Sequence, residues 1–174
     1  MISTHYIPPQ GLPMISLTVK DGRLLLLDWY NDKTQRLFER LNVGTTFVEC
    51  AKLNASNIDE AVALQTVREL DEYFLGKRQS FTVPLDLSHG TDFQQQVWQT
   101  LCEIPYGQTI SYKELAQRIG KPTAFRACAN ANGKNLISLI VPCHRVIASD
   151  GGLGGYTGGV DIKQRLLALE KSYA

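Results

Sequence analysis

Hydrophobic positions early in the chain predict a strand hairpin followed by a helix. The stretch MISLTVKDGRLLLLDWY (residues 14–30) places residues suited to strands on both sides of Asp21-Gly22, a dipeptide typical of tight hairpin turns. From Asn57, a candidate N-cap, apolar residues recur every three or four positions up to Gly76, which predicts a helix. The residues expected on its apolar stripe are Ala61, Leu64, Val67, Leu70 and Phe74.

The pattern changes between residues 84 and 91, where we place a domain boundary. FTVPLDLSHG (residues 81–90) is extended in character, and Pro84 favours an edge strand or a linker. After it, Thr91 or Asp92 can cap a helix that ends before Pro105. This helix is expected to bury Phe93, Val97, Trp98 and Leu101.

Two further helices joined by a short turn are expected in SYKELAQRIGKPTAFRACANANGKN (residues 111–135). Ser111 and Glu114 have the spacing of a capping box, and Leu115, Ala116 and Ile119 face inward. Gly120-Lys121-Pro122 forms the turn, and the second helix runs from Thr123 to about Asn132. The pair predicts a helix-turn-helix.

These elements predict an α/β chain of the α+β type with two domains. Residues 1–86 form a small domain of sheet plus helix with a structural role. Residues 91–174 form a mostly helical domain that contains the helix-turn-helix.

The second helix of the pair is rich in alanine, and this has two interpretations. Ala124, Ala127, Ala129 and Ala131 leave a surface that a DNA minor groove could approach closely, beside the single long side chain of Arg126. Alternatively, alanine simply favours helix and packs tightly.

Composition and charge narrow the class of protein. The chain has 174 residues, of which 44% are hydrophobic, so it is not a disordered segment. It has no apolar run long enough for a membrane helix and no signal peptide, which predicts a cytoplasmic location. Its four cysteines lack C-x-x-C spacing and its three histidines are far apart, so we expect no metal and no cofactor. Residues 1–90 carry a net charge of −2 and residues 91–174 a net charge of +3, a weak sign of a polyanionic partner for the second half.

The apolar stretch LISLIVPCHRVI (residues 136–147) contains the candidate chemistry. Its composition predicts a buried strand, interrupted at Pro142 so that Cys143 lies where the strand ends. A cysteine here is either an inert small hydrophobe or a nucleophile whose thiol pKa is lowered by a nearby imidazole or cation. His144 would act as the base after a turn at Pro142 or through a water, with Glu170 as a candidate carboxylate to orient it.

The residues around this cysteine resemble one family. IVPCHRVI, with ANGKN before it and GGYTGG and KQRLLALE after it, is similar to the O6-alkylguanine-DNA alkyltransferases, also called methylated-DNA–protein-cysteine methyltransferases. The resemblance extends from FQQQVW at Phe93 to Glu170, whereas the first half matches only in its order of strands and helix. It implies DNA repair by a monomer that acts on nucleoid DNA. The alkyl group of O6-alkylguanine in double-stranded DNA would pass irreversibly to Cys143, and O4-alkylthymine is a further possible substrate.

The resemblance also implies roles for individual residues. His144 would generate the thiolate through water, Glu170 would hold the imidazole, Asn135 would be the hinge, and Arg126 would fill the space left by the flipped base. The expected DNA contacts are Tyr112, Arg126, Ala127, Asn132 and Arg145. The expected substrate pocket comprises Tyr112, Val146, Tyr156, Thr157 and Gly158. Asn130 and Leu136 stand where many members have glycine and proline, which bears on DNA affinity and on the hinge.

Three alternatives remain open from the residues. A non-catalytic protein that binds alkylated DNA would lack the acceptor cysteine. A helix-turn-helix regulator would need neither the cysteine and histidine nor a glycine-rich lid. A cysteine hydrolase would need an oxyanion hole and repeated turnover.

Overall fold

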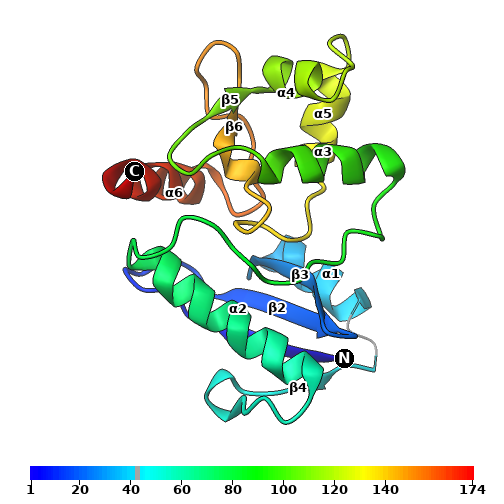
Figure 1. The fold of residues 1–174 in the computed structure, drawn as a ribbon, viewed down its shortest axis with the longest axis vertical. Coiled ribbons are helices and arrows are strands. Elements are labelled where there is room, and N and C mark those ends of the chain that lie inside the picture. The colour runs from blue at the N-terminus through cyan, green and yellow to red at the C-terminus, as the bar shows by residue number, and fades with distance from the viewer. Residues whose placement is uncertain (42–43) are drawn as a thin grey trace. The chain divides into compact units, whose positions relative to one another are not determined.

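The computed structural model describes residues 1–41 and 44–174, apart from the side chains of residues 33, 37 and 41 (Figure 1). The chain divides into two compact units, Met1–Asp86 and Leu87–Ala174. The elements of the first unit are β1 (Ile2–Tyr6), β2 (Ile15–Lys20), β3 (Arg23–Trp29), α1 (Asp32–Leu41), β4 (Thr46–Phe47), the 3-10 helix η1 (Cys50–Lys52) and α2 (Ile58–Phe74).

The strands of the first unit form one sheet in the order β3-β2-β1-β4. The predicted hairpin is confirmed, because β2 and β3 pair in antiparallel fashion from Ile15↔Trp29 to Lys20↔Arg23. Asp21 and Gly22 both have positive φ, of 50° and 70°, which suits a two-residue turn that follows the right-handed twist of the strands. Strand β4 pairs in parallel with β1 at the other edge.

Helix α2 packs against this sheet, as Figure 1 shows. The predicted cap is confirmed, since the side chain of Asn57 accepts a hydrogen bond from the backbone N–H of Glu60. The expected apolar stripe is partly wrong, because Leu64 is 39% exposed. The buried residues of this helix also recur at helical spacing, and they are Asp59, Val62, Ala63, Thr66, Glu69, Leu70, Tyr73 and Phe74.

The segment before the second unit adds a short pairing at the β3 edge. Leu85 forms a parallel bridge with Leu24, and the backbone N–H of Leu24 donates to the carbonyl of Pro84 at 2.8 Å. Proline has no backbone N–H to donate, but only its carbonyl is paired here. Pro84 can therefore lie at the edge of the sheet without leaving a ladder hydrogen bond unmade.

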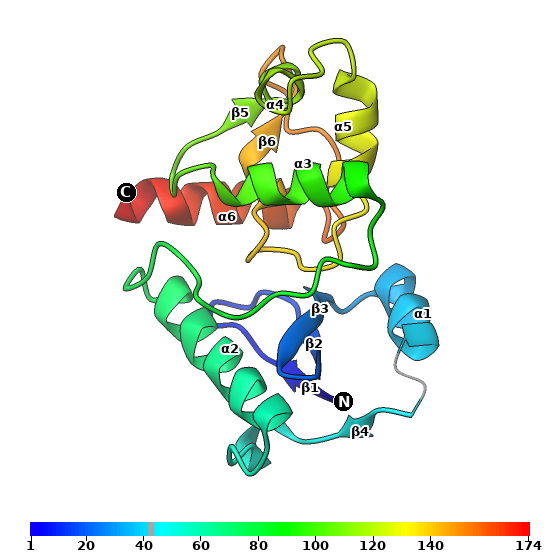
Figure 2. The ribbon, with the colours of Figure 1, turned by 45° about the vertical axis from the view of Figure 1, so that its right-hand side comes forward.

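The second unit is mostly helical. Its elements are α3 (Asp92–Cys102), β5 (Ile110–Ser111), α4 (Tyr112–Arg118), α5 (Phe125–Asn132), the 3-10 helix η2 (Cys143–Arg145), β6 (Val146–Ile147) and α6 (Val160–Tyr173). Figure 2 shows α3, α4 and α5 packed as one group, and Nε1 of Trp98 on α3 donates to the carbonyl of Ala131 on α5 at 2.9 Å. Thr91 forms a capping box with Gln94 at the start of α3, while Phe93 is only half-buried.

The helix-turn-helix is present with small differences from expectation. Ser111 caps α4 by accepting from the N–H of Glu114, but the Glu114 carboxylate pairs with Arg118 at 2.8 Å, so the predicted capping box is only half formed. Gly120 has a φ of 72° in the turn. Helix α5 begins at Phe125, two residues later than expected, and the N-cap residue Ala124 makes no side-chain cap.

The predicted strand over residues 136–147 is wrong except at its end. Only Val146–Ile147 forms a strand, paired in parallel with β5, and Ser138 and Val141 make an isolated bridge. Leu139 has a φ of 76°, which a regular strand does not allow. The segment is buried as expected, but side chains and turns, rather than a neighbouring strand, satisfy much of its backbone.

Candidate active site

Cys143 is the first residue of the 3-10 turn η2. The residue is 2% exposed and its thiol is not in a disulfide. The backbone around it is held in place, because its N–H donates to the carbonyl of Val141 at 2.7 Å and its carbonyl accepts from Nδ2 of Asn132 at 3.4 Å. The thiol therefore has a defined position away from bulk water.

His144, the next residue, is held by a carboxylate from α6. Its Nε2 lies 2.8 Å from Oε1 of Glu170, and both side chains are fully buried. Burial by itself would raise the pKa of Glu170, but the hydrogen bonds that it accepts from His144 and Arg145, together with the positive charge of Arg145, lower that pKa to about 2. Glu170 is therefore ionised at neutral pH and accepts a hydrogen bond from the ring.

Arg145 provides the charge that keeps Glu170 ionised. Its Nε donates to Oε2 and its Nη2 to Oε1, each at 2.9 Å, a bidentate geometry that suits a carboxylate. Its Nη1 donates to the carbonyl of Ile104 at 2.7 Å. The DNA contact expected of Arg145 is wrong here, because the residue is 6% exposed and its donors are used inside the protein.

The imidazole of His144 retains an unused acceptor. Burial lowers the pKa of His144, and Glu170 only partly opposes this, so the ring is neutral near pH 7. A neutral ring has one N–H, and with Nε2 donating to Glu170 the lone pair is on Nδ1. Nδ1 is buried and has no hydrogen-bond partner among residues 1–41 and 44–174. A base is thus available one residue from the thiol.

A buried amine also lies in the electrostatic neighbourhood of this thiol. Lys163 on α6 is fully buried, and its Nζ donates to the carbonyl of Val146 at 2.6 Å and to that of Leu153. Burial lowers the pKa of Lys163, whereas the charge of Cys143 acts to raise it. The side chain joins the segment after η2 to the glycine-rich loop, and a positive charge here favours the thiolate.

Tyr112 and the glycine-rich loop, residues 151–159, border the same region. Burial and the charge of Cys143 raise the pKa of Tyr112, and a hydrogen bond with Asn132 opposes this. A Cβ built on Gly154 would lie 3.2 Å from Oη of Tyr112, and Gly154 has a φ of 66°, so the loop needs glycine at this point. The ring of Tyr156 lies 6.4 Å from that of His144, centroid to centroid.

Known proteins match the chain over both units. The description "6-O-methylguanine DNA methyltransferase, ribonuclease-like domain" matches residues 15–87, and "6-O-methylguanine DNA methyltransferase, DNA binding domain" matches residues 92–172. A methylated-DNA–protein-cysteine methyltransferase of Methanosarcina barkeri is 56% identical over 108 residues, which cover 62% of this chain and 68% of the relative. The chain belongs to the methylated-DNA–protein-cysteine methyltransferase family.

Other members of the methylated-DNA–protein-cysteine methyltransferase family agree with this assignment. An inducible enzyme of that name from Bacillus subtilis is 53% identical over 103 residues, covering 59% of this chain and 57% of the relative. The structure of Mycobacterium tuberculosis OGT in complex with DNA has a TM-score of 0.80 at 38% identity and covers 100% of this chain and 95% of that one. The fold of the family therefore extends over the whole length of this chain.

The structure separates the DNA contacts expected for this family member into two groups. Arg126 and Ala127 are exposed on α5, as is Asn130, and Tyr112 is half-buried at the start of α4. Asn132 is 3% exposed, and its side chain joins α5 to the carbonyl of Cys143. The expected DNA contact of Asn132 is therefore wrong in this structure, because its amide is inside the protein.

Asn135 organises the irregular segment that leads to the cysteine. It is buried, its Nδ2 donates to the carbonyl of Val141 at 2.8 Å, and its Oδ1 accepts from the N–H of Ile137 at 3.0 Å. Leu136, which follows it, is half-buried. Of the remaining residues expected at the pocket, Val146 is fully buried, while Tyr156, Thr157 and Gly158 are half-buried.

The described residues provide neither a metal cluster nor a membrane span. Within this part of the chain, no group of three or more His, Cys, Asp or Glu side chains is placed to hold a metal ion. None of the described helices is both long and apolar enough to cross a membrane.

Lys163 is a buried residue near the thiol that was not predicted from the sequence. Its spacing carries a signal, because Lys163, Leu166 and Glu170 are separated by three and four positions, which places them on one stripe of the last helix. Leu166 is an ordinary core residue, so a lysine on the same stripe indicates a buried amine that requires acceptors.

Proposed function

We propose that this protein repairs alkylated DNA by transferring an alkyl group from O6 of guanine to Sγ of Cys143, once per protein molecule. The observation that carries the proposal is the arrangement around the buried thiol: a neutral imidazole held through Nε2 by an ionised carboxylate, with Nδ1 unused among the described residues. Membership of the methylated-DNA–protein-cysteine methyltransferase family supports the same reaction.

The chemistry is a single displacement. His144, through a water, takes the thiol proton, and the Sγ thiolate attacks the alkyl carbon. A carbon–sulfur bond forms as the carbon–O6 bond breaks and the bonding pair stays on the guanine, which is then protonated through water by the proton that His144 took from the thiol. Glu170 keeps the ring of His144 in one tautomer and stabilises the imidazolium that forms.

Contacts with DNA are assigned to α4, α5 and the turn between them. The basic side chains exposed there are Lys113, Arg118, Lys121 and Arg126, and Lys134 is exposed two residues after the end of α5. Glu114 is the acidic residue of the same segment and is paired with Arg118. In the proposal Tyr112 pushes on a phosphate, Ala127 allows close approach to the minor groove, and Arg126 fills the space left when the target base leaves the stack.

The remaining roles are also proposals. Asn135 is the hinge between α5 and the active-site turn, and Val146, Tyr156, Thr157 and Gly158 line the space for the extruded base. The second unit, Leu87–Ala174, carries DNA binding and alkyl transfer, and the first is structural. We place the activity in the cytoplasm on nucleoid DNA, where a reducing environment keeps the Cys143 thiol from being oxidised.

The alternatives fit the site less well. A protein that only binds alkylated DNA has no use for a buried cysteine beside an oriented base. A regulator of the helix-turn-helix class does not require the network of His144, Arg145 and Glu170. A cysteine hydrolase would release its product and act again, which separates it from the proposal experimentally.

The experiment is to incubate the protein with a duplex that contains one O6-methylguanine and to weigh its cysteine peptides. We expect the added mass of a methyl group on the Cys143 peptide. The other cysteines, Cys50, Cys102 and Cys128, are internal controls and should stay unmodified. Methylation elsewhere, or nowhere, would contradict the proposal.

A further inference from the structure

Phe125 is a large apolar side chain on the surface of the helix assigned to DNA. It is the first residue of α5 and is 44% exposed. The rest of this helix, RACANAN, has small side chains and asparagines besides the long side chain of Arg126. Phe125 is therefore the one bulky apolar residue of this helix. Alanine would favour the helix more than phenylalanine does, so helix formation gives no reason for a phenylalanine at this position.

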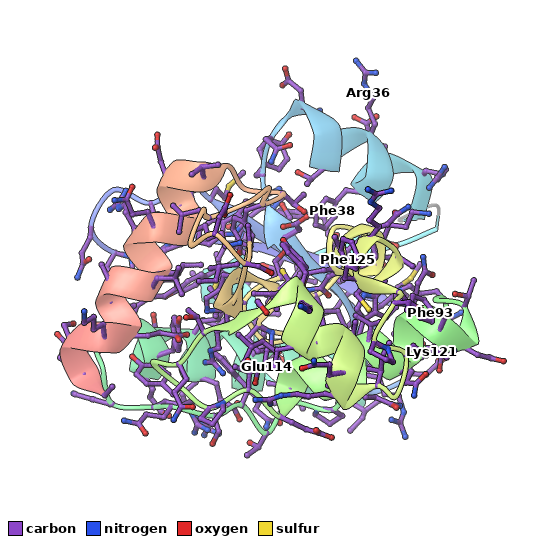
Figure 3. The ribbon with its side chains drawn as sticks, turned by 90° about the horizontal axis from the view of Figure 1, so that it is seen from above. Arg36, Phe38, Phe93, Glu114, Lys121 and Phe125 are labelled. Atoms are coloured by element: carbon purple, nitrogen blue, oxygen red, sulfur yellow. The ribbon has the colours of Figure 1, made fainter. Side chains whose placement is uncertain are left out.

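The ring of Phe125 is paired with the side chain proposed to enter the DNA. Cζ of Arg126 lies 5.8 Å from the centroid of this ring, which is within the range of a cation–π contact. A second cation–π pair occurs in the same unit. Nζ of Lys121, in the turn before α5, lies 5.0 Å from the centroid of the ring of Phe93 on α3. Figure 3 shows Phe125 on α5 and the side chains of Phe93 and Lys121 close together.

The surroundings of Phe125 fit nucleic acid better than a protein partner. The other exposed large hydrophobic residues of the second unit, Val160 and Tyr173, are on α6 rather than on the helix-turn-helix. A single exposed ring among cations does not form an apolar patch of the kind that proteins use for association. It does match the apolar wedges and aromatic stacking groups by which proteins hold opened or bent DNA.

We propose that Phe125 is a second residue of α5 that enters the minor groove, beside Arg126. Its ring packs on the sugars and the base edge next to the vacated position, and it orients the guanidinium of Arg126 toward the gap. This role rests on the proposed function, since it concerns the opening of the duplex that precedes transfer. Phe125 is a positioning residue that touches DNA and takes no part in the chemistry at Cys143.

The test compares Phe125→Ala and Phe125→Trp with the parent protein on two substrates, a duplex with one O6-methylguanine and the free O6-benzylguanine base. A 2-aminopurine next to the lesion reports base unstacking by fluorescence. We expect Phe125→Ala to slow transfer from the duplex by about tenfold and to reduce the fluorescence change, with no effect on the free base. Phe125→Trp, which restores an aromatic ring, should recover both duplex signals. Tyr173→Ala, which removes an aromatic ring that is 47% exposed on α6, is the matched control and should behave as the parent does.

The outcomes that overturn this proposal differ from those that overturn the function. If Phe125→Ala reacts with the duplex as fast as the parent, or slows the duplex and the free base equally, the residue has no role in opening DNA. If the parent itself accepts no alkyl group from either substrate, the proposed function fails first. Thermal melting of each variant checks the fold, which an exposed alanine at the start of a helix should preserve.

Discussion

Nε2 of His144 lies 2.8 Å from Oε1 of Glu170, across 26 positions of sequence, and neither side chain has exposed surface. The same carboxylate receives the guanidinium of Arg145. One ionised group on the last helix therefore orients the candidate base and neutralises a buried cation. Stability and catalysis are coupled at this residue, which makes its titration informative.

The first prediction concerns acid stability. The pKa of Glu170 is lowered from 4.5 to about 2 in the folded protein. The ionised carboxylate therefore contributes fully to the free energy of unfolding above pH 4.5, and this contribution is lost as the pH falls through 2. Between about pH 6 and about pH 2, the free energy of unfolding of the parent should fall by about 3 kcal/mol more than that of Glu170→Gln, which has no charge to lose. Urea unfolding at several pH values measures this difference.

A matched control for this prediction is Glu103→Gln, because Glu103 is exposed in the same unit. Its pH dependence should follow the parent. Glu170→Gln should also be less stable than the parent at neutral pH, since it leaves Arg145 without its counter-charge. Parallel curves for the parent and Glu170→Gln would show that the carboxylate is not held as described.

The second prediction separates binding from chemistry at Cys143. Cys143→Ser should abolish alkyl transfer while DNA binding is retained, because a hydroxyl of similar size does not ionise near pH 7. Gel-shift binding and a transfer assay on the same preparation measure both properties. Cys102→Ser should transfer as the parent does. Residual transfer by Cys143→Ser would move the acceptor to another residue.

The third prediction concerns Arg126 and the opening of the duplex. Extruding a base costs a few kcal/mol, and the proposal places Arg126 in the gap that remains. Arg126→Ala should therefore slow repair of a duplex strongly while leaving the reaction with free O6-benzylguanine unchanged. Lys171→Ala, a charge change on α6 away from the helix-turn-helix, is the control. Equal slowing on both substrates would remove Arg126 from this role.

The fourth prediction concerns the buried amine of Lys163. Lys163→Met keeps the length of the side chain but leaves the carbonyls of Val146 and Leu153 without this donor, which should cost about 1–3 kcal/mol of stability. Loss of the positive charge should also raise the pKa of the Cys143 thiol. The pH at which the alkylation rate increases should therefore be higher for Lys163→Met than for the parent. Lys171→Met is the control. An unchanged pH profile in a folded Lys163→Met protein would show that the amine only fastens the loop.

Local signals allowed much of the fold to be predicted. Asp21-Gly22 predicted the hairpin because few residue pairs accept positive φ twice, and Asn57, Thr91 and Ser111 predicted helix starts because their side chains satisfy free backbone N–H groups. These features depend on residues within four positions of one another. Cys143 and His144 were likewise predicted from a short motif, and Glu170 was a candidate carboxylate on the last helix.

The features that failed depend on distant partners. An apolar run such as residues 136–142 is typical of a buried strand, but here the amide of Asn135 satisfies the backbone of an irregular segment. Arg145 and Asn132 have the polar side chains expected of DNA contacts, yet Glu170, Ile104 and Cys143 provide their partners inside the protein. Periodicity and motif spacing carry no information about which long side chain turns inward.

In the proposed reaction Cys143 is consumed. A thioether bond between sulfur and carbon has no leaving group that the site could use to restore the thiolate, so each protein molecule should act once. This separates the proposal from every mechanism with turnover, including hydrolysis by a cysteine nucleophile.

The most direct measurement is a titration of a duplex containing one O6-methylguanine against a fixed amount of protein, with repaired guanine counted at each point and the Cys143 peptide weighed at the end. We expect a sharp plateau at one repaired guanine per protein molecule, with every Cys143 peptide methylated. Repaired guanine that accumulates beyond the amount of protein, or a plateau with Cys143 unmodified, would contradict it.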